Sequence, residues 1–201
     1  MGKISSYAID STPNLSDKLI GTDVDNLNST KNFTVGQVVS LANANIIFNQ
    51  VLNGSSTVAQ APSALNTPLI VSFGAAQGGP STDIELQAGG KIIFNTSGQY
   101  FINAYGNVER QGSSGGTAVV LFRALLNGTQ LSTTKGFRLD TPNLPDPYEV
   151  TIPFYANAGD IFWFEIMRDS SGTNAGGIYP HTNLGGWSNV PSSQIQIWKL
   201  N

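Results

Sequence analysis

The chain has 201 residues, no cysteine, a net charge of −3 and only 11% charged residues. Its length suits one full domain and a short extra module. Without cysteine, disulfide scaffolds, zinc fingers and thiol catalysis are excluded. No cluster of Lys and Arg offers the basic surface that phosphate contacts require, which argues against nucleic-acid binding. No apolar run reaches the roughly 18 residues of a membrane helix, and the first residues lack the apolar core of a signal peptide, so we expect no membrane insertion.

The first 42 residues carry the marks of a small hairpin followed by a helix. Segments 17–22 and 30–35 read as short strands, and the Asn and Asp residues between them favour a turn. Thr34 and Gln37 have the spacing of a capping box, which predicts a helix over 35–42. That helix places apolar residues on one stripe. A hairpin and one short helix cannot bury a core, so this module is expected to pack against a partner.

Residues 43–66 mix Asn, Ala, Ser and Gln with scattered Ile, Val and Leu. We predict an extended neck here, because Asn53-Gly54-Ser55-Ser56 interrupts the apolar run 46–52. Apolar side chains are unusual in a free linker. The alternative, that the segment adds an edge strand to the following domain, stays open at this point.

Residues 67–201 carry short strands at the spacing of an all-β antiparallel sandwich. Polar and apolar residues alternate over 100–105, 148–155 and 194–198, whereas 118–126 is apolar on both faces apart from Arg123. Asn127-Gly128 is a strong signal of a two-residue hairpin turn. These patterns predict a two-sheet sandwich over the whole segment.

Four motifs in this order resemble the C1q/tumour-necrosis-factor jelly-roll superfamily. They are Phe94-x-x-x-Gly98-x-Tyr100, Leu126-Asn127-Gly128, Ala158-Gly159-Asp160 before an aromatic strand, and the closing strand Ser193 to Trp198. The motifs span about 130 residues, nearly the whole C-terminal region. The resemblance implies a ten-stranded jelly roll that forms a tight homotrimer and works by presenting loops.

The N-terminal segment resembles the head segment of tailed-phage structural proteins. The similarity lies in 16–23 and in 30–36, about 40 residues in all. In those chains such a segment tends to attach a trimeric fibre or knob to the particle. The resemblance implies an anchor over 1–42, a neck over 43–66 and a head over 67–201. The anchor contacts would come from Leu19, Ile20, Phe33, Val35, Val38 and Val39.

No catalytic arrangement is visible in the sequence. The single histidine, His181, has no acid beside it in sequence, and no Gly-x-Ser-x-Gly elbow marks a nucleophile. Asp169 with Asn174, or Asp140 with Asp146, could offer oxygen ligands to calcium. Their spacing matches no calcium loop, so a solvated turn is the better interpretation. We therefore expect no enzymatic activity, no metal and no cofactor.

The aromatic residues suggest two interaction sites. Where a strand has apolar residues on both faces, one face packs in the core and the other would be exposed to water. Packing between the copies of a trimer would bury this second face. We predict a trimer interface at Phe101, Tyr105, Phe162, Trp163 and Phe164, without deciding which strand face is core. In the loop 176–191, aromatic residues lie beside Asn and Gly and could stack on sugars. A ligand loop would comprise Tyr179, His181 and Trp187, whereas the favoured interpretation of Trp187 is that it caps the sandwich.

The sequence as a whole predicts a virion structural protein of a tailed phage. The expected role is a trimeric capsid decoration protein or head fibre, made in the host cytoplasm and located on the virion surface. Its partners would be two further copies of itself and, through the N-terminus, the major capsid protein or another virion component. The alternative is a receptor-binding tail-fibre tip that recognises a host surface polysaccharide.

Overall fold

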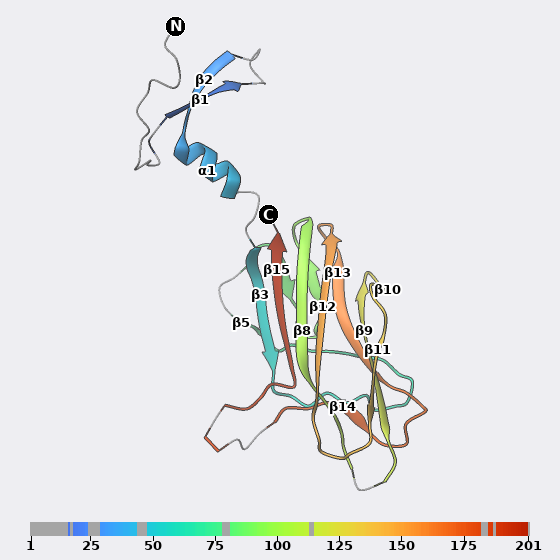
Figure 1. Ribbon diagram of the computed structural model, residues 1–201. Coiled ribbons are helices and arrows are strands. Elements are labelled where there is room, and N and C mark those ends of the chain that lie inside the picture. Colours follow the sequence, from blue (N-terminus) through green and yellow to red (C-terminus); the bar gives the residue numbers. More distant parts are fainter. Residues whose placement is uncertain are drawn as a thin grey trace. The chain divides into compact units, whose positions relative to one another are not determined.

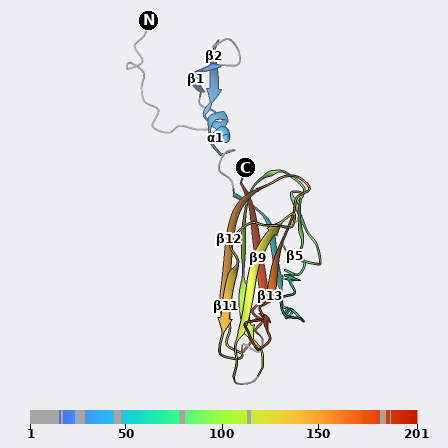
Figure 2. The same cartoon turned by 90° about the vertical axis from the view of Figure 1, so that its right-hand side faces the viewer.

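The computed structural model describes residues 16, 18–23, 29–43, 48–77, 81–112, 115–181, 185–186 and 188–200. The chain divides into two compact units, one formed by Met1–Ile47 with Asn201 and the other by Phe48–Leu200 (Figures 1 and 2). We call the first the N-terminal unit and the second the head, and we describe each by itself.

The N-terminal unit is a hairpin followed by a helix, as the sequence predicts. Strand β1 (Lys18–Asp23) pairs antiparallel with β2 (Ser29–Thr34), and helix α1 (Val35–Asn43) follows directly. The predicted capping box is present. The amide of Gln37 donates to Oγ1 of Thr34 at 3.1 Å, and the amide of Thr34 donates to Oε1 of Gln37 at 2.8 Å. These reciprocal bonds satisfy two amide donors at the start of α1 and fix where the helix begins.

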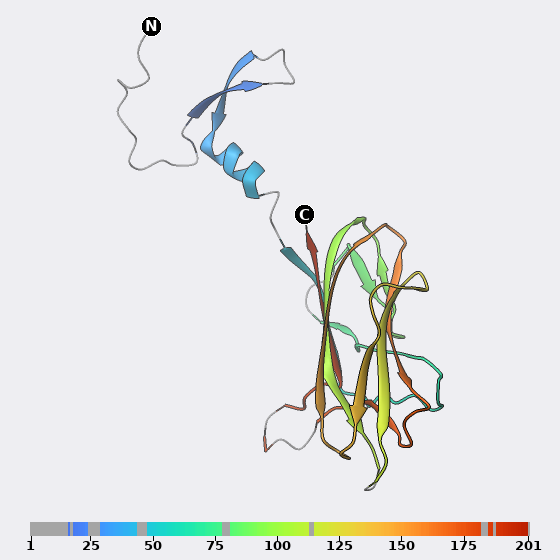
Figure 3. The same cartoon turned by 45° about the vertical axis from the view of Figure 1, so that its right-hand side comes forward.

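The head is a sandwich of two antiparallel sheets that face each other (Figure 3). Within the described residues, one sheet has the order β12-β8-β15-β3-β5, with β14 also paired to β8; we call it the β8 sheet. The other has the order β10-β9-β13-β7-β6, with β11 paired to β9 and β4 to β13; we call it the β9 sheet. The strands of the β8 sheet are β3 (Phe48–Ser56), β5 (Ala76–Gln77), β8 (Gly98–Arg110), β12 (Asp146–Ala156), β14 (Gly176–Ile178) and β15 (Ser193–Leu200). Those of the β9 sheet are β4 (Leu69–Ile70), β6 (Ile84–Leu86), β7 (Ile92–Phe94), β9 (Ala118–Leu126), β10 (Thr129–Gln130), β11 (Lys135–Leu139) and β13 (Ile161–Arg168).

The order of the strands makes the head a jelly roll. The chain crosses from β7 to β8, back to β9 and β11, across to β12, back to β13 and across again to β14 and β15. Repeated crossing between two antiparallel sheets is the winding of a jelly roll. The predicted fold class, an all-β antiparallel jelly-roll sandwich, is therefore confirmed.

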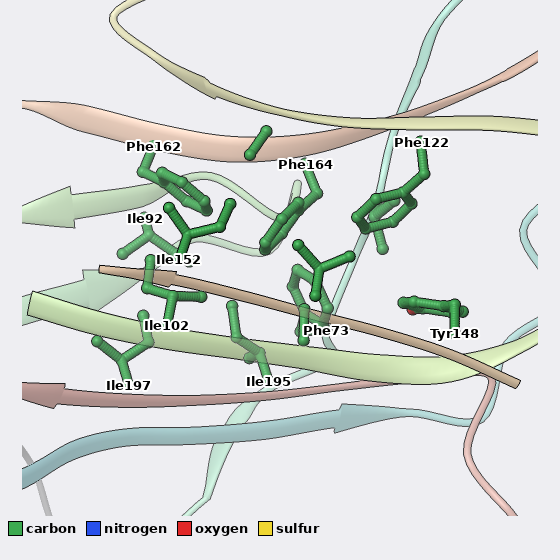
Figure 4. Packing of buried hydrophobic residues seen from close by; sticks show 14 of the residues in the cluster. Phe73, Ile92, Ile102, Phe122, Tyr148, Ile152, Phe162, Phe164, Ile195 and Ile197 are labelled. Atoms are coloured by element: carbon green, nitrogen blue, oxygen red, sulfur yellow. The ribbon is translucent and has the colours of Figure 1, made fainter. Parts of the chain in front are cut away.

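The core lies between the two sheets and is rich in aromatic rings (Figure 4). Phe164 is fully buried, and its ring centroid lies 4.9 Å from that of Phe162, 5.0 Å from that of Phe122 and 5.9 Å from that of Phe73. The long strands alternate buried and more exposed residues, so each sheet turns one row of side chains inward. Two rows meeting in this way supply the head with a core of its own.

The predicted neck is wrong for the part of 43–66 that lies beyond Ile47. Residues 48–56 form β3, which pairs with β15 along its whole length, and the boundary between the units falls between Ile47 and Phe48. The open alternative of an added strand is the correct one. Gly54 interrupts the apolar pattern because a Cβ there would lie 3.0 Å from the carbonyl oxygen of Phe73 and 3.1 Å from Cδ2 of Leu86. Gly54, which suggested a linker in the sequence, is therefore explained by close packing within the sandwich.

The segment after β3 is fixed to the head by a buried polar cluster. Oε1 of Gln60 accepts from the amide of Ser72 at 2.7 Å, and Nε2 of Gln60 donates to the carbonyl oxygen of Ser72 at 2.9 Å and to Oγ of Ser193 at 3.1 Å. Ser192 donates through Oγ to the carbonyl oxygen of Val58 at 2.7 Å. Because buried polar groups are costly to leave unpaired, this cluster orders the chain around Gln60 as part of the sandwich.

The chain enters and leaves the head at the same end. Phe48 lies opposite Leu200 in the pairing of β3 with β15. We call this the proximal end. The opposite, distal end carries β14 and the loops around it (Figure 1). The predicted turn at 127–128 is confirmed, since Leu126 pairs with Thr129 and both turn residues have positive φ, 50° for Asn127 and 83° for Gly128.

Candidate interaction surfaces

The N-terminal unit exposes apolar side chains that were predicted to form the anchor. Leu19, Val38 and Val39 are 46%, 43% and 39% exposed. Phe33 and Val35 are half-buried, while Ile20 lies in β1 and its side chain is outside the described set. Exposed apolar side chains on so small a unit are free to contact a partner.

The five residues predicted for the trimer interface lie in three different places. Phe162 and Phe164 are 0% exposed in the core of one chain, so their prediction as interface residues is wrong. Phe101 and Tyr105 are half-buried on the outer face of the β8 sheet, whereas Trp163 lies on the outer face of the β9 sheet. A strand sends successive side chains to opposite faces, which separates Trp163 from its two neighbours.

The outer face of the β8 sheet is apolar toward the proximal end. There Trp198 of β15 lies opposite Phe101 of β8, with ring centroids 6.0 Å apart in an edge-on arrangement. Gln99, also in β8, pairs with Tyr155 of β12 on one side and with Leu200 of β15 on the other. Tyr155 is 52% exposed and Leu200 is 39% exposed. We call Phe101, Trp198, Tyr155 and Leu200 the proximal patch. Sequence reasoning missed Trp198, although its alternation with Gln194 and Gln196 places it on this face.

The outer face of the β9 sheet has a different character, because its polar groups pair with one another. Arg123 donates to Oε2 of Glu165 through Nε at 2.9 Å and through Nη2 at 2.7 Å. Trp163 donates through Nε1 to Oε1 of the same carboxylate at 2.9 Å, and Nζ of Lys91 lies 5.3 Å from the centroid of the Trp163 ring. The hydrogen-bonding groups around Trp163 therefore have partners within the chain, which makes this face a poorer candidate for an interface than the proximal patch.

At the distal end, the structure brings two of the three predicted ligand-loop residues toward one buried acid. Nε2 of His181 lies 3.5 Å from Oε2 of Glu109, whose Oε1 accepts from Gln111 at 2.6 Å. Burial raises the pKa of the Tyr179 hydroxyl, and the nearby charge of Glu109 raises it further. Trp187 lies outside the described residues. Nothing in the sequence indicates a role for Glu109, which lies 70 positions before Tyr179 and is only 6% exposed.

A buried arginine organises the neighbouring loops. Arg110 is 0% exposed and donates through Nη1 to the carbonyl oxygen of Gly116 at 2.8 Å and through Nη2 to that of Gly115 at 2.7 Å. It also donates to the carbonyl oxygen of Asp140. The guanidinium group of arginine carries five N–H donors in one plane, so a single side chain can bind several carbonyl oxygens. Arg110 thereby links the turn before β9 to the turn after β11.

The side chains considered for calcium make turn contacts in the structure. Oδ1 of Asp169 accepts from the amide of Ser171 at 2.8 Å, and the Ser171 hydroxyl and amide together lower the pKa of this carboxyl. Nδ2 of Asn174 donates to the carbonyl oxygen of Gly115 at 2.7 Å, and Oδ1 of Asp140 accepts from Arg138 at 3.3 Å. Among the residues that the structure describes, no three His, Cys, Asp or Glu side chains gather into a metal-binding group, and no helix could cross a bilayer.

Comparison with known proteins finds similarity at the level of solved structures. No family model matches the chain, and no curated protein is similar to it. Among solved structures, the chain is similar to the Eiger tumour-necrosis factor of S. frugiperda (11% identity, TM-score 0.46, covering 77% of this chain and 93% of that one). It is also similar to the globular domain of zebrafish complement 1qA protein (7% identity, TM-score 0.46, 76% and 98%) and to murine APRIL (13%, 0.44, 75% and 98%). The assignment to a jelly roll rests on the strand order described above.

Proposed function

We propose that this chain is a non-enzymatic structural protein on the surface of a tailed-phage virion, a trimeric capsid decoration protein or head fibre attached through its N-terminal unit. The observation that carries the proposal is the contrast between a self-sufficient head and an N-terminal unit whose Leu19, Val38 and Val39 remain in solvent. The resemblance of 16–23 and 30–36 to phage head segments supports the same division of roles. The partner of the N-terminal unit would be the major capsid protein or another virion component.

The proposed attachment is tested by removing the N-terminal unit. Deletion of residues 2–42 should abolish binding to particles that lack the protein, while the head remains folded and soluble. Binding is measured by co-sedimentation, with the full chain as reference. A full-length Val38→Asn and Val39→Asn double variant should also weaken binding, because it removes two of the three exposed apolar side chains without removing the unit. Particle binding by the truncated chain would contradict the proposal.

The heads are proposed to associate as a homotrimer through the proximal patch. This face carries Phe101, Trp198, Tyr155 and Leu200, whose apolar surface is costly to leave in water. The three N-terminal units of a trimer would then bind next to one another on the particle. Because they are linked in a closed trimer, binding of one unit raises the effective concentration of the other two at that site.

The choice of face is tested by a matched pair of variants. Phe101→Gln should shift the protein from trimer to monomer in light scattering, because it puts an amide into the proposed contact. Trp163→Gln is the control on the opposite face and should leave the trimer intact. Dissociation by Trp163→Gln alone would move the interface to the β9 sheet.

The second candidate is a receptor-binding fibre tip. It is favoured by the distal position of the loops near Tyr179 and His181, at the end of the head opposite to the one where the chain enters. Gold labelling of purified particles with antibody against residues 67–201 separates the two functions. Label over the capsid supports decoration, and label confined to the tail supports receptor binding.

A further inference from the structure

A groove lies on the outer face of the β8 sheet, beyond the proximal patch toward the distal end. Its volume is about 610 Å³, within the range of about 300–1,000 Å³ that ligand-binding clefts occupy. The floor is formed by outward-facing residues of β8 and β15, and the walls come from β12 and from the segment before β15. Its polar and aromatic lining residues are Asn103, Tyr105, Asn107, Tyr148, Glu149, Gln194 and Gln196.

The floor of the groove carries side-chain amides with unused hydrogen-bonding capacity. Within the described part of the chain, neither Gln194 nor Gln196 has a side-chain hydrogen bond. Asn103 donates through Nδ2 to Oε1 of Glu149 at 3.1 Å, while its own buried Oδ1 has no donor among the described residues. Each amide has both donor and acceptor groups, so the floor can pair with hydroxyl groups, which also donate and accept.

The charge of the lining selects among ligands. The described residues that line the groove include one carboxylate, Glu149, and no Lys, Arg or His. A phosphate, a sulfate or an acidic sugar would therefore meet a negative charge with no cation among the lining residues, since Lys135, which donates to the backbone carbonyl oxygen of Glu149, does not line the groove. A neutral ligand is favoured.

The sheet beneath the groove excludes one common mode of peptide binding. Strand β8 is already paired with β12 on one side and with β15 on the other through the residues of the floor. An added peptide strand needs a free sheet edge, and the floor of the groove offers none, because the end strand β12 contributes only to the wall. The ligand must instead be recognised by side chains, and Tyr105 supplies an aromatic ring with a polar tip among the amides.

We propose that this groove is a binding site for a neutral saccharide, held by hydrogen bonds to Gln194, Gln196 and Asn103 and by contact with the ring of Tyr105. Glu149, oriented by Asn103, accepts a further hydroxyl and disfavours acidic sugars. Neither Tyr179 nor His181 lines the groove, although Val190 and Pro191 of the same loop contribute to its wall. The site requires neither attachment to a particle nor a trimer. Repetition of the site in several linked copies would strengthen weak binding to a polysaccharide.

The proposal is tested on the full-length chain with free monosaccharides as probes. Glucose, galactose, mannose and N-acetylglucosamine are titrated while backbone amide shifts of the protein are followed by NMR. At least one of them should bind with millimolar affinity and shift the amides of 103–107 and 194–196. Glucuronate, which differs from glucose by its carboxylate, should bind more weakly than glucose. Equal or tighter binding of glucuronate would overturn the assigned role of Glu149 and the neutral specificity.

Variants then locate the site. The double variant Gln194→Ala and Gln196→Ala should weaken saccharide binding at least about tenfold, because two hydrogen bonds are lost. Gln99→Ala removes an exposed amide from the same face outside the groove and should bind as the natural chain does. The proposal is overturned if no probe shifts the groove amides, or if the double variant binds normally. It is also overturned if the double variant changes the oligomeric state in light scattering, which would make the groove a contact between copies.

Discussion

In the N-terminal unit, Leu19, Val38 and Val39 leave 39–46% of their surface in solvent, whereas in the head Phe73, Phe162 and Phe164 leave none. The N-terminal unit is built from residues close in sequence, a hairpin whose second strand runs directly into a capped helix. The head joins strands from opposite ends of its sequence, such as β3 and β15. The difference teaches that the head is stabilised by its own core, while the N-terminal unit has apolar surface left for a partner.

The largest expected effect in this comparison comes from the core of the head. Phe164→Ala should lower the free energy of unfolding of the head by about 3–5 kcal/mol, because it removes a fully buried ring from contact with Phe73, Phe122 and Phe162. Urea unfolding followed by fluorescence measures the change. Val58→Ala, at a side chain 68% exposed, is the control and should stay within about 0.5 kcal/mol. A loss below about 1 kcal/mol for Phe164→Ala would show that the core is less tightly packed than described.

A smaller loss is expected where the head orders its distal loops with a polar residue. Arg110→Met removes this donor from the carbonyl oxygens of Gly115, Gly116 and Asp140. Asn174 still donates to Gly115, and water can reach these exposed residues, so we expect a total loss of about 1–3 kcal/mol. The melting temperature should fall, and amide exchange should accelerate around residues 115–117 and 140–143. Arg138→Met, at an exposed side chain, is the matched control. Unchanged exchange in these loops would refute the organising role of Arg110.

The helix cap allows the N-terminal unit to be perturbed alone. Thr34→Ala removes the acceptor for the amide of Gln37 and should destabilise α1 by about 1 kcal/mol. Faster amide exchange over 35–43 measures this effect, while urea unfolding of the head should be unchanged. Thr34→Ser keeps the hydroxyl and should restore protection. A change in the head would mean that the two units are coupled, and the comparison would fail.

The smallest effect concerns an ion pair that fastens the last strand of the head. Nζ of Lys199 lies 2.7 Å from Oδ1 of Asp83 and 2.7 Å from Oγ1 of Thr96. These hydrogen bonds hold the pKa of Asp83 below its ordinary value of 3.8 and that of Lys199 above 10.5. The stabilisation is therefore complete between these two values. It is lost as pH falls through the lowered pKa of Asp83, or rises through the raised pKa of Lys199.

Lys199→Met should remove the alkaline flank and reduce the acid flank, to which the Thr96 hydroxyl bound to Asp83 also contributes. The variant should cost about 0–1 kcal/mol at neutral pH, because the pair is partly exposed. Thermal unfolding across the pH range measures the profile. Lys18→Met, in the N-terminal unit, should leave the profile of the head as it is. Identical acid and alkaline flanks in the Lys199→Met variant and the natural chain would contradict the assignment.

The sequence is informative wherever structure is decided locally. The capping box of Thr34 and Gln37 and the turn at Asn127-Gly128 are both found where the pattern predicts them. The strand over 161–166 is different, because large apolar residues lie on both of its faces. Period two puts neighbouring side chains on opposite faces but cannot say which face is core. A single interface of Phe162, Trp163 and Phe164 therefore fails, because Trp163 lies on the other side of the strand.

Interactions between distant residues escape such reasoning. Gln60 looks like a linker residue, yet its side chain reaches Ser193, 133 positions away. Arg110 lies in a strand next to another charge and reads as a solvated side chain, but the fold buries it among backbone carbonyls. The amides of the groove come from β8 and β15, and only the register of those strands places Gln196 opposite Asn103.

The pairing of Phe48 with Leu200 has a practical consequence for engineering the protein. A tag or fluorescent protein fused after the last residue would emerge beside the strand through which the N-terminal unit joins the head, where it would crowd attachment and the proximal patch. A cargo inserted directly after Gly112, two residues beyond the end of β8 and close to its pairing with β14 at the distal end, would instead be carried away from both. Display on this scaffold should therefore use this internal position and leave both chain ends unmodified.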